Sequence, residues 1–142
     1  MSKKQSTPGP KSVLIVEDST DFSNLLKFIV EDDGFTGVQF PVQEDDIVGW
    51  AKQHQAAAIC MDLALGRKGG MDFIGRLKAD PETSAIPIII ITGRELAFKD
   101  VLQLQAQGVK YLRKGRVEMD EIREAIRDAV SPVPAGDKGR KK

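Results

Sequence analysis

The stretch AAAICMDLAL, residues 56–65, places one carboxylate, Asp62, at the end of a run of small and apolar side chains. Such a run is typical of a buried β-strand. Burying an unpaired charge is unfavourable by several kcal/mol, or it shifts the pKa of the group until the group is neutral. We therefore expect Asp62 to be paired with another group, exposed at an edge of the fold, or used chemically.

The apolar pattern of residues 56–62 recurs along the chain and alternates with helical patterns. Strands are predicted at 12–18, 35–40, 56–62, 86–92 and 109–114, and helices at 21–34, 44–55, 71–80, 94–108 and 117–130, with a loop at 63–70. Because the strands are continuously apolar, the sheet should be covered by helices on both faces and should be parallel. The predicted fold class is α/β, a doubly wound five-stranded parallel sheet with five helices.

The length of 142 residues fits one domain with two tails. We assign the domain to residues 12–130. The tails, residues 1–11 and 131–142, are rich in Pro, Gly, Ser and Lys and are expected to be flexible. A second interpretation is also open for the C-terminal tail, which is compatible with the start of a linker to an output domain outside this chain.

Charge and hydropathy exclude several classes of protein. The tails hold seven of the 21 basic residues and one of the 21 acidic residues, which leaves 14 basic and 20 acidic residues in the domain, a net charge of −6. This charge argues against nucleic acid as the ligand of the domain. No apolar run approaches the roughly 20 residues that span a bilayer, and the N-terminus lacks a secretory signal. The single cysteine, Cys60, suits a reducing cytoplasm.

Polar side chains stand at the ends of four predicted strands: Glu17 and Asp18, Asp62, Thr92, and Lys114. In a parallel sheet these ends meet at one edge, where ligands of such folds bind. Three neighbouring carboxylates repel one another, and a hard divalent cation such as Mg²⁺ would relieve the repulsion. The sequence therefore predicts a magnesium site beside an ionised Asp62.

A carboxylate nucleophile, a metal, a hydroxyl and an ammonium group together suit the binding of a phosphoryl group. Phosphoryl transfer depends on alignment and on charge stabilisation. Asp62 is the candidate nucleophile, while Thr92 and Lys114 are the candidate partners of the phosphoryl oxygens.

These motifs, in this order, resemble the response-regulator receiver domain of two-component signalling over residues 12–130. The resemblance rests on LIVEDS, ICMDLALGRKGGMD, IIIITG and YLRKG, and on Gly70 at a position where the family usually has glycine. It implies the flavodoxin-like strand order 2-1-3-4-5. It also implies that the protein is a stand-alone single-domain response regulator or the receiver part of a longer one.

The resemblance implies a role for each site residue. Asp62 would accept the phosphoryl group, and Asp18 would bind Mg²⁺ directly. Glu17 would bind Mg²⁺ mainly through water, and the main-chain carbonyl of Ala64 would be a further ligand.

Three residues would act after phosphorylation. Thr92 and Lys114 would each contact a phosphoryl oxygen, and Tyr111 would be the switch aromatic that turns inward as the threonine shifts. The surface made by the fourth helix, the fifth strand and the fifth helix would then be remodelled for a partner.

The expected partners are a histidine kinase or phosphotransfer protein as donor and a downstream protein as target. We expect no nucleic-acid or membrane partner, a cytoplasmic location, and a monomer or weak dimer. The protein would not be an enzyme in the ordinary sense, since it would catalyse only its own phosphorylation and dephosphorylation.

One departure leaves an alternative open. Gly115 follows Lys114 where the family usually has proline, often after a cis peptide, so this loop is expected to be trans or more mobile. A pseudo-receiver, acting as a phosphorylation-independent interaction module, is the alternative function. A dehalogenase-type phosphatase would need an acid at position 64, and a P-loop nucleotidase would need a motif that this chain lacks.

Overall fold

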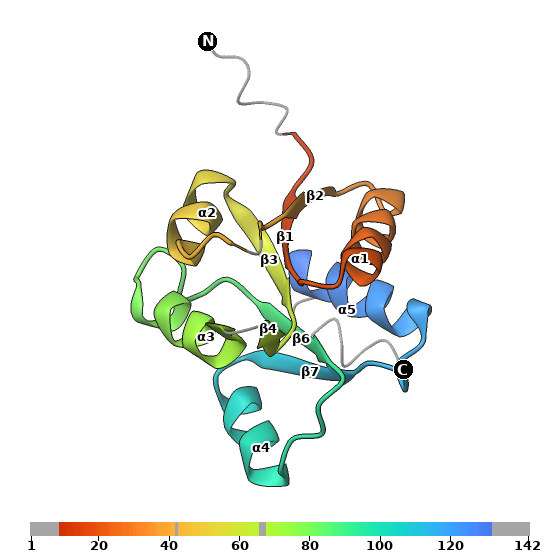
Figure 1. Cartoon of the computed structure of the whole chain (residues 1–142). Helices are drawn as coiled ribbons and strands as arrows, with labels where there is room; N and C mark the ends of the chain where they lie inside the picture. Colours follow the sequence, from red (N-terminus) through yellow and green to blue (C-terminus); the bar gives the residue numbers. More distant parts are fainter. Residues whose placement is uncertain (1–8, 42, 66–67, 132–142) are drawn as a thin grey trace, which may run out of the picture.

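The computed structural model describes residues 9–41, 43–65 and 68–131. The elements run in the order β1 (Ser12–Val16), α1 (Thr20–Asp32), β2 (Thr36–Gln39), α2 (Ile47–Gln53), β3 (Ala56–Met61), β4 (Ala64–Leu65), β5 (Lys68–Gly69), α3 (Gly70–Ala79), β6 (Ile88–Thr92), α4 (Phe98–Ala106), β7 (Val109–Arg113) and α5 (Met119–Val130) (Figure 1). Nearly all of the two predicted tails lies outside the described residues.

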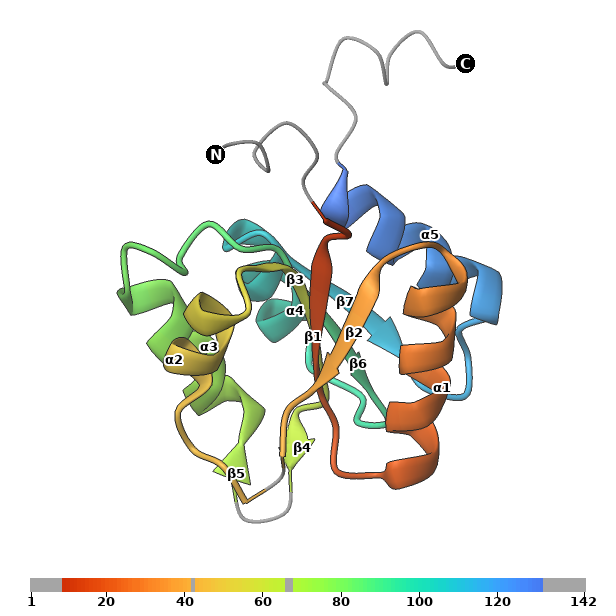
Figure 2. The same ribbon diagram turned by 90° about the horizontal axis from the view of Figure 1, so that it is seen from above.

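The main sheet has five parallel strands in the order β2-β1-β3-β6-β7. This order is the predicted 2-1-3-4-5, because β4 and β5 form a separate pair. Helices α1 and α5 cover one face, while α2, α3 and α4 cover the other (Figure 2). The predicted doubly wound α/β fold is confirmed.

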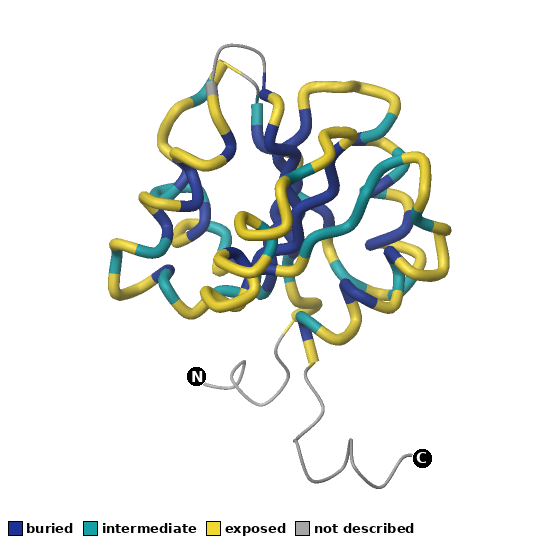
Figure 3. The backbone as a smooth tube through the Cα atoms, turned by 90° about the horizontal axis from the view of Figure 1, so that it is seen from below, coloured by how far each residue is buried: buried dark blue, intermediate teal, exposed yellow. Residues whose placement is uncertain are grey.

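Alternate residues of the central strands serve the two halves of the core. On β1, Leu14 and Val16 pack toward α2, α3 and α4, whereas Val13 and Ile15 pack toward α1 and α5. All four side chains are buried. Figure 3 shows these strands as the buried centre of the molecule. This two-sided burial explains why the strands are continuously apolar in sequence.

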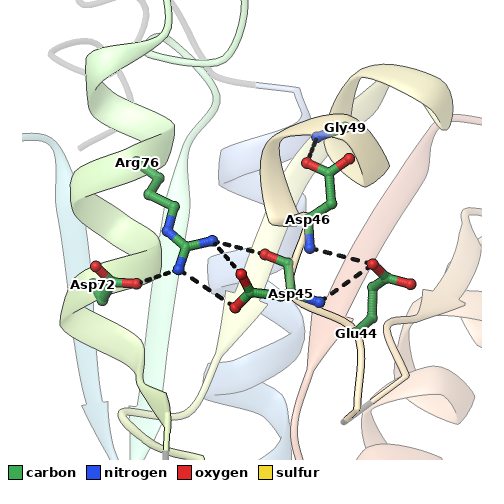
Figure 4. A network of polar contacts seen from close by, with 6 residues as sticks. All are labelled: Glu44, Asp45, Asp46, Gly49, Asp72 and Arg76. Carbon is green, nitrogen blue, oxygen red and sulfur yellow. Dashed lines mark hydrogen bonds and ion pairs between the residues drawn. The ribbon is translucent and has the colours of Figure 1, made fainter.

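Helix α2 is shorter than predicted and is tied to α3 by an arginine. It begins after Asp46, whose carboxylate accepts a hydrogen bond from the N–H of Gly49 at 2.9 Å. Figure 4 shows Arg76 of α3 reaching across to donate to the carbonyl oxygen of Asp45 at 2.8 Å. The same guanidinium lies 2.7 Å from the carboxylate of Asp72. These contacts are exposed, so they fix orientation more than they stabilise the fold.

Helix α4 is also shorter than the predicted 94–108. Two side chains engage the peptide groups of Arg94 in the preceding loop: the Thr92 hydroxyl accepts its N–H at 3.4 Å, and the Tyr111 hydroxyl donates to its carbonyl at 2.8 Å. The helix begins only at Phe98, after this loop. Tyr111 comes from a strand that follows the helix, so local periodicity does not reveal this boundary.

The predicted loop at 63–70 contains a small hairpin. Ala64 pairs with Gly69, and Leu65 pairs with Lys68, in antiparallel register. Helix α3 starts directly afterwards at Gly70, whose N–H donates to the carbonyl of Leu63 at 3.0 Å. The hairpin thus brings the start of α3 back against the residue that follows Asp62.

No helix in the described part of the chain is long and apolar enough to cross a membrane.

Gly70→Ala should destabilise the fold by about 1–3 kcal/mol, because a Cβ here would meet backbone atoms that cannot move aside easily. It would lie 2.7 Å from the carbonyl oxygen of Asp62 and 2.8 Å from the Cα of Leu63. Gly75→Ala, in the same helix and facing open space, is the matched control. It should raise the free energy of unfolding by about 0.5–1 kcal/mol. Urea unfolding measures both variants, and equal stabilities would contradict the close approach at Gly70.

Candidate functional site

Asp62 lies immediately beyond β3, and its backbone is fixed by the neighbouring strand. Its N–H donates to the carbonyl of Val16 at 3.0 Å. Its side chain is 7% exposed, and its Oδ1 atom accepts the N–H of Ala64 at 3.1 Å. The question raised by the sequence is thereby answered, since Asp62 is a nearly buried carboxylate at the carboxyl edge of the sheet.

Glu17 occupies the equivalent place beyond β1 and is more deeply buried. Its side chain is 2% exposed. Its Oε2 atom accepts the N–H of Ser19 at 3.0 Å. Its Oε1 atom is the single fully buried side-chain oxygen or nitrogen, among the described residues that are not exposed, that makes no hydrogen bond.

Lys114 links the two carboxylates. Its Nζ atom donates hydrogen bonds to Oδ2 of Asp62 at 3.1 Å and to Oε2 of Glu17 at 3.3 Å. It also lies 3.1 Å from Oε1 of Glu17, at ion-pair distance but without hydrogen-bond geometry. Its backbone N–H donates to the carbonyl of Thr92 at 2.8 Å, which continues the pairing of β7 with β6 by one residue. The strand order therefore brings together charges that are 52 and 97 positions apart in sequence.

The ion pair changes the proton affinities of Glu17 and Lys114. Burial raises the pKa of Glu17 above its usual value, although the Ser19 N–H and the Lys114 ammonium both favour the charged form. Burial alone would lower the pKa of Lys114, but its bonds to Asp62 and Glu17 outweigh burial and raise that pKa. We therefore expect Lys114 to be charged. For Glu17, burial has the largest effect on the pKa.

Asp18 completes an acidic cluster. Glu17, Asp18 and Asp62 each offer a carboxylate oxygen, and these atoms lie within 4.8 Å of one another. Asp18 is exposed, whereas the other two are buried. Three carboxylates in one cluster fit a divalent cation that keeps part of its water shell, and Glu17 has one buried oxygen, Oε1, that accepts no hydrogen bond. Ala64 lies exposed two positions beyond Asp62, and a ligand role for its carbonyl stays a prediction.

Thr92 ends the strand next to β3 and is fully buried. It is connected to Tyr111 through Arg94, because the Thr92 hydroxyl and the Tyr111 hydroxyl bind the two peptide groups of that residue. Tyr111 is half-buried against the core. The two predicted switch residues are thus joined by one loop residue.

The peptide between Lys114 and Gly115 is trans, since no described residue follows a cis bond. Gly115 adopts φ of +82°, a left-handed conformation that the proline ring cannot reach. The trans alternative expected for this loop is therefore correct. The chain uses a glycine turn where the related pattern has proline.

Sequence reasoning missed two residues of the site. Ser19 caps α1 by accepting the Phe22 N–H at 3.3 Å, while its own N–H binds Glu17. The ring centroid of Phe22 lies 4.5 Å from Nζ of Lys114. Ser19 carried a signal, because serine before a helical pattern predicts an N-cap. Phe22 carried none beyond its helical spacing.

Comparison with known proteins identifies the same region. The model of the response regulator receiver domain family matches residues 13–127. The polar-differentiation response regulator DivK of Brucella anthropi is 31% identical over 83 residues, which cover 58% of this chain and 67% of DivK. The sensory transduction protein RegX3 of Mycobacterium tuberculosis is 30% identical over 105 residues, which cover 72% of this chain but 44% of RegX3.

A solved structure shares the fold. The receiver domain of the sensor histidine kinase PA1611 from Pseudomonas aeruginosa superposes with a TM-score of 0.71 at 21% identity. The match covers 86% of this chain and 98% of that domain, which holds a magnesium ion coordinated in its active-site cleft.

Lys114→Met should lower the free energy of unfolding by about 1–3 kcal/mol at pH 7, because it leaves a buried carboxylate without its cation. The pKa of Glu17 is already raised by burial, so ionising it opposes folding as pH rises above the usual value of 4.5. Without Lys114 this opposition grows, and the gap between variant and wild type should widen from pH 4.5 to pH 8. Urea unfolding across this range is the measurement.

Glu17→Gln in the Lys114→Met background is the control, since it removes the ionising group and should narrow the gap again. Parallel stability curves for wild type and Lys114→Met would show that Lys114 does not compensate the ionisation of Glu17, and coincident curves would show that the ion pair contributes nothing to folding.

Proposed function

The chain belongs to the response regulator receiver domain family, and we propose that it is a signalling switch controlled by phosphorylation of Asp62. One observation supports this most strongly: a nearly buried aspartate directs one oxygen at a lysine ammonium, within a cluster of acids. An aspartate that only capped a turn would need neither partner. The proposed donors are a histidine kinase or a phosphotransfer protein in the cytoplasm.

The proposed reaction is a direct transfer. One carboxylate oxygen of Asp62 forms a bond to phosphorus while the bond between phosphorus and the donor's histidine nitrogen breaks. The electron pair stays on that nitrogen, which takes up a proton from water. Lys114, 3.1 Å from Oδ2, lies close enough to pair with an oxygen of the incoming group. The protein thus acts on itself, and we propose no external substrate for catalytic turnover.

A divalent cation belongs to the proposal. Glu17, Asp18 and Asp62 would hold Mg²⁺, which would offset the negative charge of the phosphoryl group. Asp18 is the exposed member of the cluster and is the one best placed to receive a hydrated cation. The Ser19 N–H binds Oε2 of Glu17, and this bond orients the whole carboxylate toward the cluster.

The proposed switch runs from Thr92 to the surface. A phosphoryl group carries nearly two negative charges and three acceptor oxygens, so it draws the Thr92 hydroxyl toward it. The hydroxyl would then turn away from the N–H of Arg94, whose carbonyl binds Tyr111. The surface of α4, β7 and α5 would be biased toward a second arrangement. On α4, Phe98 is 76% exposed and Leu102 is 49% exposed, and we propose that both contact the downstream protein. The proposed oligomeric state is a monomer or a weak dimer.

Magnesium should stabilise the wild type against heat, because a ligand that binds only the folded state raises its stability. At ten times the dissociation constant the gain is about 1.4 kcal/mol, or roughly 3–8 °C in melting temperature. Asp18→Asn should lose most of this shift while staying folded, since its side chain is exposed. Differential scanning calorimetry with and without MgCl₂ is the measurement, and equal shifts in both proteins would remove Asp18 from the site.

Wild type incubated with acetyl phosphate and MgCl₂ should gain the mass of one phosphoryl group, and Asp62→Asn should gain none. Asp128→Asn, which replaces an exposed acid on α5, is the matched control and should be labelled like wild type. Intact-mass spectrometry gives the result. Equal labelling of Asp62→Asn would exclude Asp62 as acceptor, and no labelling of wild type would favour a phosphorylation-independent interaction module.

A further inference from the structure

The Lys114 ammonium has a third neighbour besides its two carboxylates. The half-buried ring of Phe22, in the first turn of α1, has its centroid 4.5 Å from Nζ. A cation at this distance from an aromatic ring is attracted by the negative charge density of the ring face. The Lys114 side chain is 25% exposed, so the contact is partly shielded from water.

The position of this ring is fixed by the same loop that orients Glu17. Ser19 donates its N–H to Glu17, and its hydroxyl accepts the N–H of Phe22. The loop between β1 and α1 therefore presents a carboxylate and an aromatic ring to one ammonium group. Phe22 also packs with the core between α1 and α5, which restricts its movement.

The two carboxylates that pair with Lys114 would also be ligands of a divalent cation. Glu17 and Asp62 are both members of the acidic cluster that fits a divalent cation. A cation that takes one oxygen from each carboxylate would compete with Lys114 for both groups and weaken its two ion pairs. The aromatic ring offers no oxygen ligand to a hard cation, so its contact with Lys114 stays available.

The backbone beyond Lys114 is a hydrogen-bonded turn, in which the N–H groups of Arg116 and Val117 both donate to the carbonyl of Arg113 at 3.1 Å. These bonds and the bond from the Lys114 N–H to Thr92 fix the main chain, but they do not fix the lysine side chain. Gly115 adopts a positive φ and has open space around it. The four-carbon stem of lysine is flexible. Without a side-chain contact, the ammonium would move among several rotamers.

We propose that Phe22 is a positioning residue, which holds the Lys114 ammonium beside Asp62 through a cation–π contact when the carboxylates are engaged elsewhere. This inference rests on the proposed function, because it assigns Lys114 to the incoming phosphoryl group. Phe22 itself touches neither Asp62 nor that group. It acts by limiting the positions of a neighbouring charge.

The first test is an NMR measurement that needs no phosphoryl donor. The Lys114 Cε protons should show an upfield ring-current shift in wild type, both without MgCl₂ and at saturating MgCl₂. The shift should be lost in Phe22→Leu and retained in Phe22→Tyr. Phe28→Leu is the control, because Phe28 lies on the same helix and is 59% exposed. Absence of the shift in wild type, or its loss on adding MgCl₂, would overturn the proposal.

The second test is a double-mutant cycle on the rate of phosphoryl uptake from acetyl phosphate at saturating MgCl₂. Phe22→Leu should slow uptake about 3- to 10-fold, the range expected for a partly shielded cation–π contact. Phe22→Tyr and Phe28→Leu should leave the rate within about twofold, less than about 0.4 kcal/mol. In the Lys114→Met background, Phe22→Leu should have no further effect, whereas an equal slowing there would show that Phe22 acts on packing alone.

The two tests separate the proposal from its premise. If wild type takes up no phosphoryl group but shows the ring-current shift with MgCl₂, the proposed function fails and the placement of Lys114 by Phe22 stands. If uptake occurs on Asp62 and Phe22→Leu matches wild type in rate, the function stands and the positioning role is wrong.

Discussion

The ion pairs that join Lys114 to Glu17 and Asp62 are the constraint on which the site depends. Two carboxylates buried at adjacent strand ends repel each other, and burial by itself raises the pKa of Glu17. One ammonium, 3.1 Å from an oxygen of each, compensates both charges. This arrangement requires β1, β3 and β7 to end at the same edge of the parallel sheet. The charge compensation therefore depends on the observed strand order.

Much of the fold could be predicted from the sequence because the three central strands, β1, β3 and β6, are buried on both faces. Their apolar runs, which alternate with helical patterns, leave few arrangements other than a doubly wound sheet. The predicted start of α4 at residue 94 is wrong, since the helix begins at Phe98 and Arg94 lies in a loop where its peptide groups bind Thr92 and Tyr111. The β4–β5 hairpin was missed for a different reason. Each of its strands has two residues, which is too short for any periodic pattern to show.

The candidate site likewise has residues that could be predicted from the sequence and one that could not. Glu17, Asp18, Asp62 and Lys114 could be predicted to converge, because polar residues at the ends of buried strands must meet in a parallel sheet. Phe22 could not, since its spacing is that of an ordinary core residue of an amphipathic helix. Its contact with Lys114 depends on how α1 packs over the sheet, which helical spacing alone does not give.

The same lysine has a structural and a proposed functional role, and these compete. As a partner of two buried carboxylates it stabilises the fold, but an ammonium engaged with both must weaken these contacts to bind a new anion. An aromatic neighbour weakens this conflict, because its attraction for the ammonium does not depend on the carboxylates and has no strict direction. It lets Lys114 exchange one anionic partner for another without moving into solvent. The turn at Gly115 does not replace such a neighbour, since its hydrogen bonds hold the main chain and leave the flexible lysine side chain to be placed by its own contacts.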